Sequence, residues 1–191
     1  MSNRIQVEIS ARHLHLSKEH LAVLFGEGAE LTCKKYLSQP GQFACMERVH
    51  IIGPKGKLAN VIIIGPTRAK TQVEVSLSDA RILGLNPPIR PSGDLEGSEG
   101  CRLVGPAGEL YVPECVIVAK RHIHMSPEDA KALGLHDLDD VYFKVETPDR
   151  TMIFGDMVVR TNDQSATFAH IDTDEANAAG ISGRVFGELF Q

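Results

Sequence analysis

Short hydrophobic runs joined by tight turns dominate the chain. In VHIIGPKGKLANVIIIG, residues 49–65, two apolar runs flank a turn in which Pro54 presets φ and Gly56 completes the reversal. CRLVGPAGELYVPECVIVA at 101–119 and VYFKVETPDRTMIFGDMVV at 141–159 repeat this arrangement. Short β segments at such spacing are typical of small barrels and sandwiches. The pattern therefore predicts a mainly β chain.

Brief helical segments are expected between the hairpins. Three of them end on Gly followed by an aliphatic residue, a common helix stop: residues 79–85, 129–135 and 175–181. The expected N-caps are Ser78, Ser126 (followed by Pro127) and Thr173. Helices of one or two turns fit the ends of small barrels, so we expect barrels capped by short helices.

Two segments lack clear periodicity. Residues 86–100 are rich in Pro, Gly and Ser and predict an exposed loop. Residues 26–46 contain two turn signals and predict either a lid insertion over a site or an ordinary surface loop.

Composition excludes several classes of partner. The formal net charge of −5 and the absence of Trp argue against a nucleic-acid surface, which needs basic fields and stacking faces. The longest aliphatic run, residues 61–64, is far shorter than the roughly 20 residues of a membrane span. The four cysteines show no C-x-x-C spacing, which favours reduced thiols. We therefore expect a cytoplasmic protein that binds neither nucleic acid nor membrane.

The strongest chemical signal is a duplicated histidine motif. ARHLHLS at 11–17 returns as KRHIHMS at 120–126. Because side chains alternate along a strand, the two histidines of each copy point to one face and can bind one metal ion. The repeat continues further on, where an offset of 96 residues aligns Glu74 with His170. The chain thus holds two candidate half-sites: His13, His15 and Glu74, and His122, His124 and His170.

The two half-sites would differ in charge. With Zn²⁺ bound, the site of two neutral imidazoles and one carboxylate would have a net charge of about +1, whereas the site of three neutral imidazoles would have about +2. The second suits phosphate or water, and the first still accepts a thiolate. Three protein ligands and an open position are typical of catalytic zinc. The asymmetry indicates a two-substrate reaction.

Arg68 lies six residues before Glu74. On an unbroken strand this even spacing would place both side chains on one face. A guanidinium near two metal ions would bind an anionic oxygen group through its planar fork. The alternative is a structural arginine paired with a carboxylate.

These motifs resemble the phosphotransacylases of the phosphate propanoyltransferase family, known from propanediol-utilising microcompartments. The resemblance rests on SARHLHLS, QPGQFA, GPTRAKTQVEVS, KRHIHMSPEDA and ATFAHIDTDEAN in this order, over nearly the whole chain. It implies two β-barrels capped by short helices, with the active site and two divalent ions, usually zinc, between them. One barrel would comprise residues 1–11 and 120–191, and the other residues 12–119.

The resemblance also implies roles for individual residues. The family's six metal ligands coincide with the two half-sites above, and its essential arginine with Arg68. The segment with Gln39, Pro40 and Gly41 corresponds to the lid. Coenzyme A contacts would fall on Ser10, Lys35 and Asn177.

The implied reaction converts a short-chain acyl-CoA (propanoyl or acetyl) and phosphate into acyl phosphate and CoA. We expect direct attack by phosphate rather than an acyl-enzyme, because no Ser-His or Cys-His motif is evident. The rival readings are a metal-dependent hydrolase and a non-enzymatic metal-binding or CoA-sensing module.

The first strand begins at residues 5–9 without the amphipathic peptide that directs encapsulation. This favours the cytosol over the microcompartment lumen. It leaves homo-oligomerisation and association with a microcompartment shell open.

Overall fold

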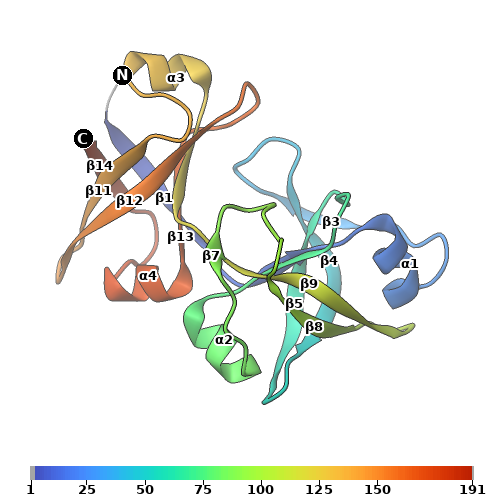
Figure 1. Cartoon of the computed structure of the whole chain (residues 1–191). Coiled ribbons are helices and arrows are strands. Elements are labelled where there is room, and N and C mark those ends of the chain that lie inside the picture. Colours follow the sequence, from blue (N-terminus) through green and yellow to red (C-terminus); the bar gives the residue numbers. More distant parts are fainter. Residues whose placement is uncertain (1–2, 191) are drawn as a thin grey trace. The chain divides into compact units, whose positions relative to one another are not determined.

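A computed structural model describes residues 3–190 (Figure 1). The chain divides into two compact units. Unit 1 contains the described residues up to Ser10, the short segment Ser38–Pro40, and the described residues from Lys120 onward. Unit 2 contains Ala11–Leu37 and Gly41–Ala119.

Unit 1 is a closed six-stranded barrel. In spatial order its strands are β1 (Arg4–Ser10), β13 (Phe168–Asp172), β10 (His122–Met125), β12 (Thr151–Thr161), β11 (Asp140–Glu146) and β14 (Phe186–Phe190). The helices α3 (Pro127–Ala132) and α4 (Thr173–Ala178) lie at opposite ends of this barrel (Figure 1).

Unit 2 also closes into a ring of six strands. The ring runs through β4 (Phe43–Ile52), β5 (Lys57–Gly65), β2 (His13–His15), β6 (Gln72–Glu74), β9 (Glu109–Ala119) and β8 (Glu99–Val104), and β8 pairs back with β4. Two further strands extend it: β3 (Cys33–Tyr36) pairs with β4, and β7 (Ile89–Arg90) pairs with β9. The prediction of two small barrels with short helices is confirmed.

The two rings share one topology. β2 is parallel to β5 and antiparallel to β6, just as β10 is parallel to β12 and antiparallel to β13. The registers agree as well, since His13 lies opposite Glu74 and His122 lies opposite His170. The internal repeat seen in the sequence is therefore a repeat of the fold.

The core of each barrel fixes the direction of the histidines. Leu14 lies between His13 and His15 and is fully buried in the core of unit 2. Ile123 lies between His122 and His124 and is fully buried in the core of unit 1. A one-residue slip in register would turn the histidines into the apolar core, so burial of these aliphatic side chains specifies the face that the histidines occupy.

The helices of unit 2 cap the barrel at hairpin turns. The last turn of α2 (Leu77–Leu83) accepts a hydrogen bond at Leu83 O from Lys55 N in the β4–β5 turn. α1 (Lys18–Phe25) meets the β8–β9 turn in the same way, through Leu24 O and Ala107 N. A Cβ added at Gly53 would lie 2.3 Å from Leu83 O, so the close approach requires glycine.

Two of the expected N-caps are wrong. Ser76, not Ser78, caps α2, and its side chain accepts from Asp79 N at 3.2 Å. Asp172, not Thr173, caps α4 in a capping box with Glu175. A cap must accept from the amide three residues on, and these two side chains lie at that spacing. Ser126 caps α3 as predicted.

The aperiodic segments contain more structure than expected. Residues 86–100 are not simply an exposed loop, because they form β7 and bury Leu95 and Ser98. Within 26–46, residues form β3 and the beginning of β4, and the lid stays a prediction.

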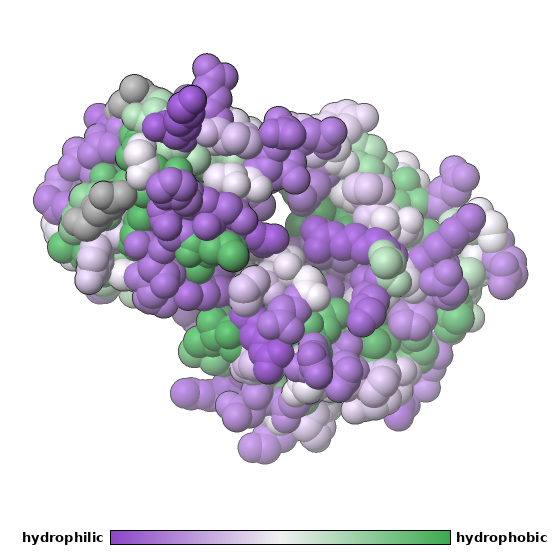
Figure 2. Space-filling model, turned by 45° about the horizontal axis from the view of Figure 1, so that its top comes forward, coloured by the Kyte–Doolittle hydropathy of each residue, from purple (hydrophilic) through white to green (hydrophobic). Residues whose placement is uncertain are grey.

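On the visible face of the molecule, hydrophobic residues lie in small groups among hydrophilic ones (Figure 2). Among the described residues, no helix is long and apolar enough to cross a membrane.

Candidate functional site

The half-site of unit 2 is a compact, buried cluster. The ligand atoms of His13, His15 and Glu74 all lie within 4.8 Å of one another. His13 Nε2 is 3.5 Å from Glu74 Oε2, and the rings of His13 and His15 are perpendicular with centroids 5.2 Å apart. Strand alternation on β2 and the β2–β6 register bring these three side chains together.

Backbone carbonyls fix which nitrogen of each of the two histidine rings carries the proton. His13 Nδ1 donates to Ala11 O and His15 Nδ1 donates to Ile64 O, each at 2.9 Å. A carbonyl oxygen only accepts, so each Nδ1 carries the proton and each Nε2 has a free lone pair in the neutral ring. Metal-bound histidines typically show this pattern, in which the second ring nitrogen donates to a carbonyl or carboxylate.

The electrostatics of this cluster favour the ionised carboxylate. Burial opposes it, but attraction to His13 dominates and holds the pKa of Glu74 well below its usual range. Burial, together with the charges of His13 and Arg68, lowers the pKa of His15 to about 3. Burial would lower the pKa of His13 too, yet the neighbouring Glu74 raises it overall. A neutral His15 and an anionic Glu74 are the forms that bind a cation.

A hydrogen-bond network that the sequence did not predict orients Glu74. Gln72 Nε2 donates to Glu74 Oε1 at 2.5 Å, and Ser92 Oγ donates to the same oxygen at 2.9 Å. Gly93 N in turn donates to Gln72 Oε1 at 2.8 Å. Gln72 could have been found, because it lies two residues before Glu74 on the same face of a strand. Ser92 gave no such signal, since it reaches the site from the segment 86–100.

Arg68 reaches this half-site by an unexpected route. The prediction of an unbroken strand from Arg68 to Glu74 is wrong, because β6 contains only Gln72–Glu74 and Arg68 lies in the segment before it. Instead, Arg68 N donates to Leu16 O at 2.9 Å, which ties the segment to the end of β2. The guanidinium donates to Ser92 Oγ at 3.4 Å and helps to lower the pKa of His15.

The half-site of unit 1 gathers three imidazole rings. His122 Nε2 and His124 Nε2 are 3.2 Å apart. The ring of His170 stacks on His122 at 5.2 Å and is nearly perpendicular to His124 at 5.1 Å. His122 Nδ1 donates to Lys120 O at 2.8 Å, so its Nε2 is the unprotonated nitrogen of the neutral ring, as in unit 2.

The half-site of unit 2 fits a divalent metal ion, and one ligand pair in the half-site of unit 1 has the spacing that such an ion needs. Tetrahedral zinc with Zn–N distances of about 2.0–2.1 Å places its ligand atoms about 3.3 Å apart. The 3.2 Å between His122 Nε2 and His124 Nε2, and the 3.5 Å between His13 Nε2 and Glu74 Oε2, lie close to this spacing. Imidazole and carboxylate donors with oriented lone pairs are typical of zinc sites.

The remaining predicted residues are distributed over both units. Gln39 is buried and donates from Nε2 to Ala166 O at 2.9 Å within unit 1. Pro40 belongs to unit 1 as well, whereas Gly41, with φ +79°, begins the next stretch of unit 2.

The three predicted coenzyme A contacts do not share one unit. Ser10 ends β1 opposite Asp172, and Asn177 lies on α4, both in unit 1. Lys35 is exposed on β3 in unit 2. The coenzyme A contacts stay a prediction.

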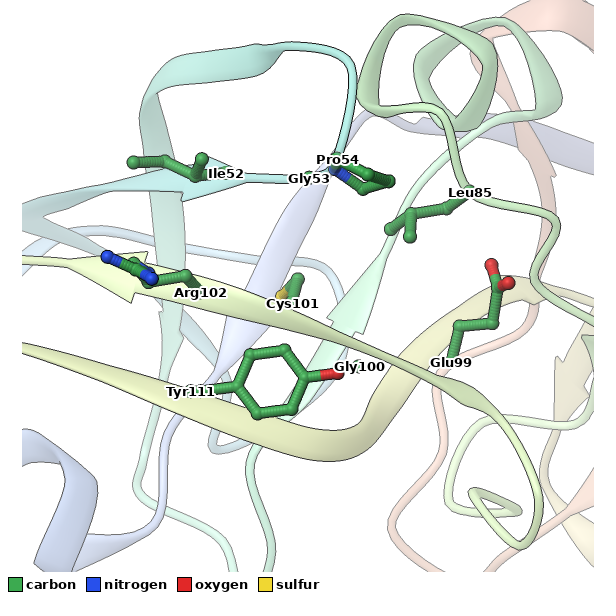
Figure 3. A pocket seen from close by; sticks show the side chains of 9 residues that line it. All are labelled: Ile52, Gly53, Pro54, Leu85, Glu99, Gly100, Cys101, Arg102 and Tyr111. Carbon is green, nitrogen blue, oxygen red and sulfur yellow. The ribbon is translucent and has the colours of Figure 1, made fainter.

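A separate cavity of about 560 Å³ lies in unit 2 (Figure 3). Ile52, Pro54, Leu85 and Tyr111 give it a largely apolar lining, and no predicted site residue lines it. Its Arg102 pairs with Glu109 at 3.1 Å. The Glu99 carboxylate accepts from Asn86 N, so the charged side chains of the lining are paired with other groups of the chain, and we assign the cavity no function.

Comparison with known proteins places the chain in one family. A family model described as phosphate propanoyltransferase matches residues 6–182. The phosphate propanoyltransferase of Thermotoga maritima is 54% identical over 178 residues, which cover 93% of this chain and 85% of the relative. That of Enterococcus faecalis is 50% identical over 189 residues, covering 99% and 89%. The resemblance seen in the sequence is confirmed: the chain belongs to the phosphate propanoyltransferase family, a family of phosphate acyltransferases.

Proposed function

We propose that this protein transfers a short-chain acyl group, propanoyl or acetyl, between coenzyme A and phosphate with the help of two divalent metal ions. Family membership supports the acyl transfer to phosphate. The observation that carries the metal dependence is the buried cluster of His13, His15 and Glu74, with both Nδ1 atoms bound to carbonyls.

Each unit would hold one ion. His13, His15 and Glu74 would hold the first, and His122, His124 and His170 the second. When bound, such ions supply Lewis-acid stabilisation of the charge that develops on the thioester oxygen and on the leaving sulfur. Gln72 and Ser92 keep the Glu74 carboxylate in place, and zinc is the metal that the donor set favours.

Arg68 would bind the phosphate. Its guanidinium presents parallel N–H groups that match two phosphate oxygens. Ser92 Oγ accepts from this guanidinium and also donates to Glu74, so one hydroxyl fixes the arginine and the carboxylate together. This arrangement would hold the nucleophilic phosphate at a defined distance from the first half-site.

In the proposed reaction, a phosphate oxygen attacks the thioester carbonyl carbon. The new C–O bond forms, the C–S bond breaks, and coenzyme A leaves as the thiolate. The buried cysteines are poor candidates for an acyl-enzyme, because burial and Glu47 raise the pKa of Cys45 to about 11. The neighbouring Cys115 thiol and burial raise the pKa of Cys101 as well. Both thiols would stay protonated and weakly nucleophilic.

Phosphate dependence tests the proposed activity. The purified protein with zinc and propanoyl-CoA or acetyl-CoA should release free CoA only when phosphate is present, with one acyl phosphate formed per thiol. A thiol reagent measures the first product, and hydroxylamine trapping the second. Equal thiol release without phosphate would instead show a hydrolase, and no release under any condition would favour a binding module.

Isotope exchange tests direct attack by phosphate. Labelled CoA should enter the acyl-CoA pool only when phosphate is present, because without an acyl-enzyme the acyl group leaves CoA only by joining phosphate. Exchange in phosphate-free buffer at a rate near turnover would establish a covalent acyl-enzyme. Cys33, an exposed cysteine, would then be the first nucleophile to replace, by Cys33→Ser.

Ser92→Ala is expected to lower kcat/KM about 10- to 100-fold, since hydrogen-bond partners of metal ligands typically contribute this much. The variant loses the hydrogen bonds to Glu74 Oε1 and from Arg68. Ser98→Ala is the matched control, because Ser98 is buried in the same segment and its Oγ has no hydrogen-bond partner within the described chain. Equal rates for the two variants would exclude a positioning role for Ser92.

A further inference from the structure

Unit 1 holds a carboxylate beside His170, the third histidine of its half-site. Glu8 lies on β1 directly opposite His170, and its Oε2 is 3.9 Å from His170 Nε2. We propose that Glu8 is a fourth protein donor for the divalent ion that His122, His124 and His170 hold, and that Ser38 orients it. The inference rests on the proposed metal-dependent function and adds a residue to its second half-site.

Comparison of the two barrels shows why a carboxylate belongs at this place. β9 pairs with β6 in parallel as β1 pairs with β13, so Ile117 opposite Glu74 corresponds to Glu8 opposite His170. In unit 2 the carboxylate, Glu74, is on β6, the strand that supplies the third ligand, and Ile117 opposite it on β9 is apolar. In unit 1 the third ligand is an imidazole and the neighbouring strand supplies the carboxylate. Each barrel thus places one carboxylate on the third-ligand strand or on the strand beside it.

Glu8 changes the charge expected for the second half-site. Three imidazoles alone leave a divalent ion at about +2, but the addition of one carboxylate lowers this to about +1. Both half-sites would then have the same net charge. They would differ in which strand supplies the anion, and not in whether an anion is present.

A short segment from elsewhere in the chain fixes the Glu8 carboxylate. Ser38 Oγ donates to Glu8 Oε2 at 2.5 Å, and Gln39 Nε2 donates to Ala166 O at 2.9 Å. These two bonds attach Ser38–Pro40 to unit 1, although the chain on both sides belongs to unit 2. A carboxylate oxygen has two lone pairs, so Oε2 can accept from Ser38 and still donate to an ion. Carboxylate ligands are commonly held by such a partner.

Metal affinity tests the role of Glu8 without reference to catalysis. Zn²⁺ affinities of the whole chain are measured by competition with a chromophoric chelator, and Co²⁺ absorption spectra report the coordination of each site. Glu8→Gln keeps the size of the side chain and can still accept from Ser38. This variant should lower the affinity for one of the two Zn²⁺ ions at least about tenfold and leave the affinity for the other unchanged. It should also alter the Co²⁺ absorption bands of one site only.

Three further variants make the result specific. Glu188→Gln removes the same charge from the same barrel, but it lies on β14 opposite Arg4, and its affinities should match those of the unaltered chain. Glu8→Asp keeps the charge on a shorter side chain, so its Zn²⁺ affinity should lie between those of Glu8→Gln and the unaltered chain. His122→Ala identifies which ion belongs to unit 1, and thermal unfolding of the metal-free proteins shows that each variant folds.

Each outcome decides one point. If Glu8→Gln binds both Zn²⁺ ions as tightly as the unaltered chain, Glu8 is not a donor, and the proposed function stands without it. A change in unfolding temperature alone, with unchanged affinities, shows a plain ion pair with His170 and overturns the inference too. If His122→Ala loses no zinc, the second ion of the proposed function is wrong and the role of Glu8 falls with it.

Discussion

Arg68→Ala is expected to lower kcat/KM for acyl transfer to phosphate by about 10²- to 10³-fold, the usual cost of removing one group that stabilises charge at the reacting atoms. The guanidinium lies beside the first half-site, near enough to lower the pKa of His15, and donates to Ser92 Oγ. The KM for phosphate should rise more than that for acyl-CoA. Initial rates over a matrix of both substrate concentrations measure the two effects.

Two variants show whether the effect belongs to the site. Arg68→Lys keeps the charge but not the planar fork, so it should recover only part of the lost rate. Arg12→Ala removes a guanidinium from the same unit, one that pairs with Asp79 at 3.0 Å, and its rate should stay within a fewfold of the unaltered enzyme. A fully active Arg68→Ala protein would mean that phosphate is bound elsewhere.

The parts of the site that could be predicted are those controlled by short-range periodicity. His13 and His15 share a face because Leu14 between them is buried, and the same holds for His122 and His124 around Ile123. The third positions, Glu74 and His170, were found through the repeat, and the strand registers place each of them opposite a histidine. Alternation and duplication leave direct traces in one sequence, which is why the two half-sites could be predicted, whereas the two barrels were implied by the family resemblance.

The parts that could not be predicted depend on contacts between distant segments. Ser92 reaches Glu74 from a segment without periodicity, and Ser38 reaches Glu8 from a stretch whose flanks belong to the other unit. Arg68 was expected on the same strand face as Glu74, but its position follows from a hydrogen bond to Leu16 O and not from strand alternation. Loop conformations and tertiary hydrogen bonds have no local pattern that a single sequence reveals.

His170→Ala is expected to abolish measurable transfer, a loss of at least about a thousandfold, because Lewis-acid stabilisation of several kcal/mol is removed with the second ion. Bound zinc, measured by elemental analysis after dialysis, should fall from two ions to one per chain. The fold should survive, since the neighbours Ala169 and Ile171 fill the core of unit 1 while His170 points to the other face.

The control for this change is His136→Ala, which removes an imidazole whose side chain is 86% exposed beside Asp139. It should keep two zinc ions and full activity. Glu74→Ala should also lose one ion, but that ion belongs to the other unit, so the double variant with His170→Ala should bind none. A His170→Ala protein that retains two ions and normal turnover would contradict the ligand assignment. Retention of one ion with normal turnover would instead show that a single half-site carries the reaction, and that the duplication of the barrel served the fold and not the chemistry.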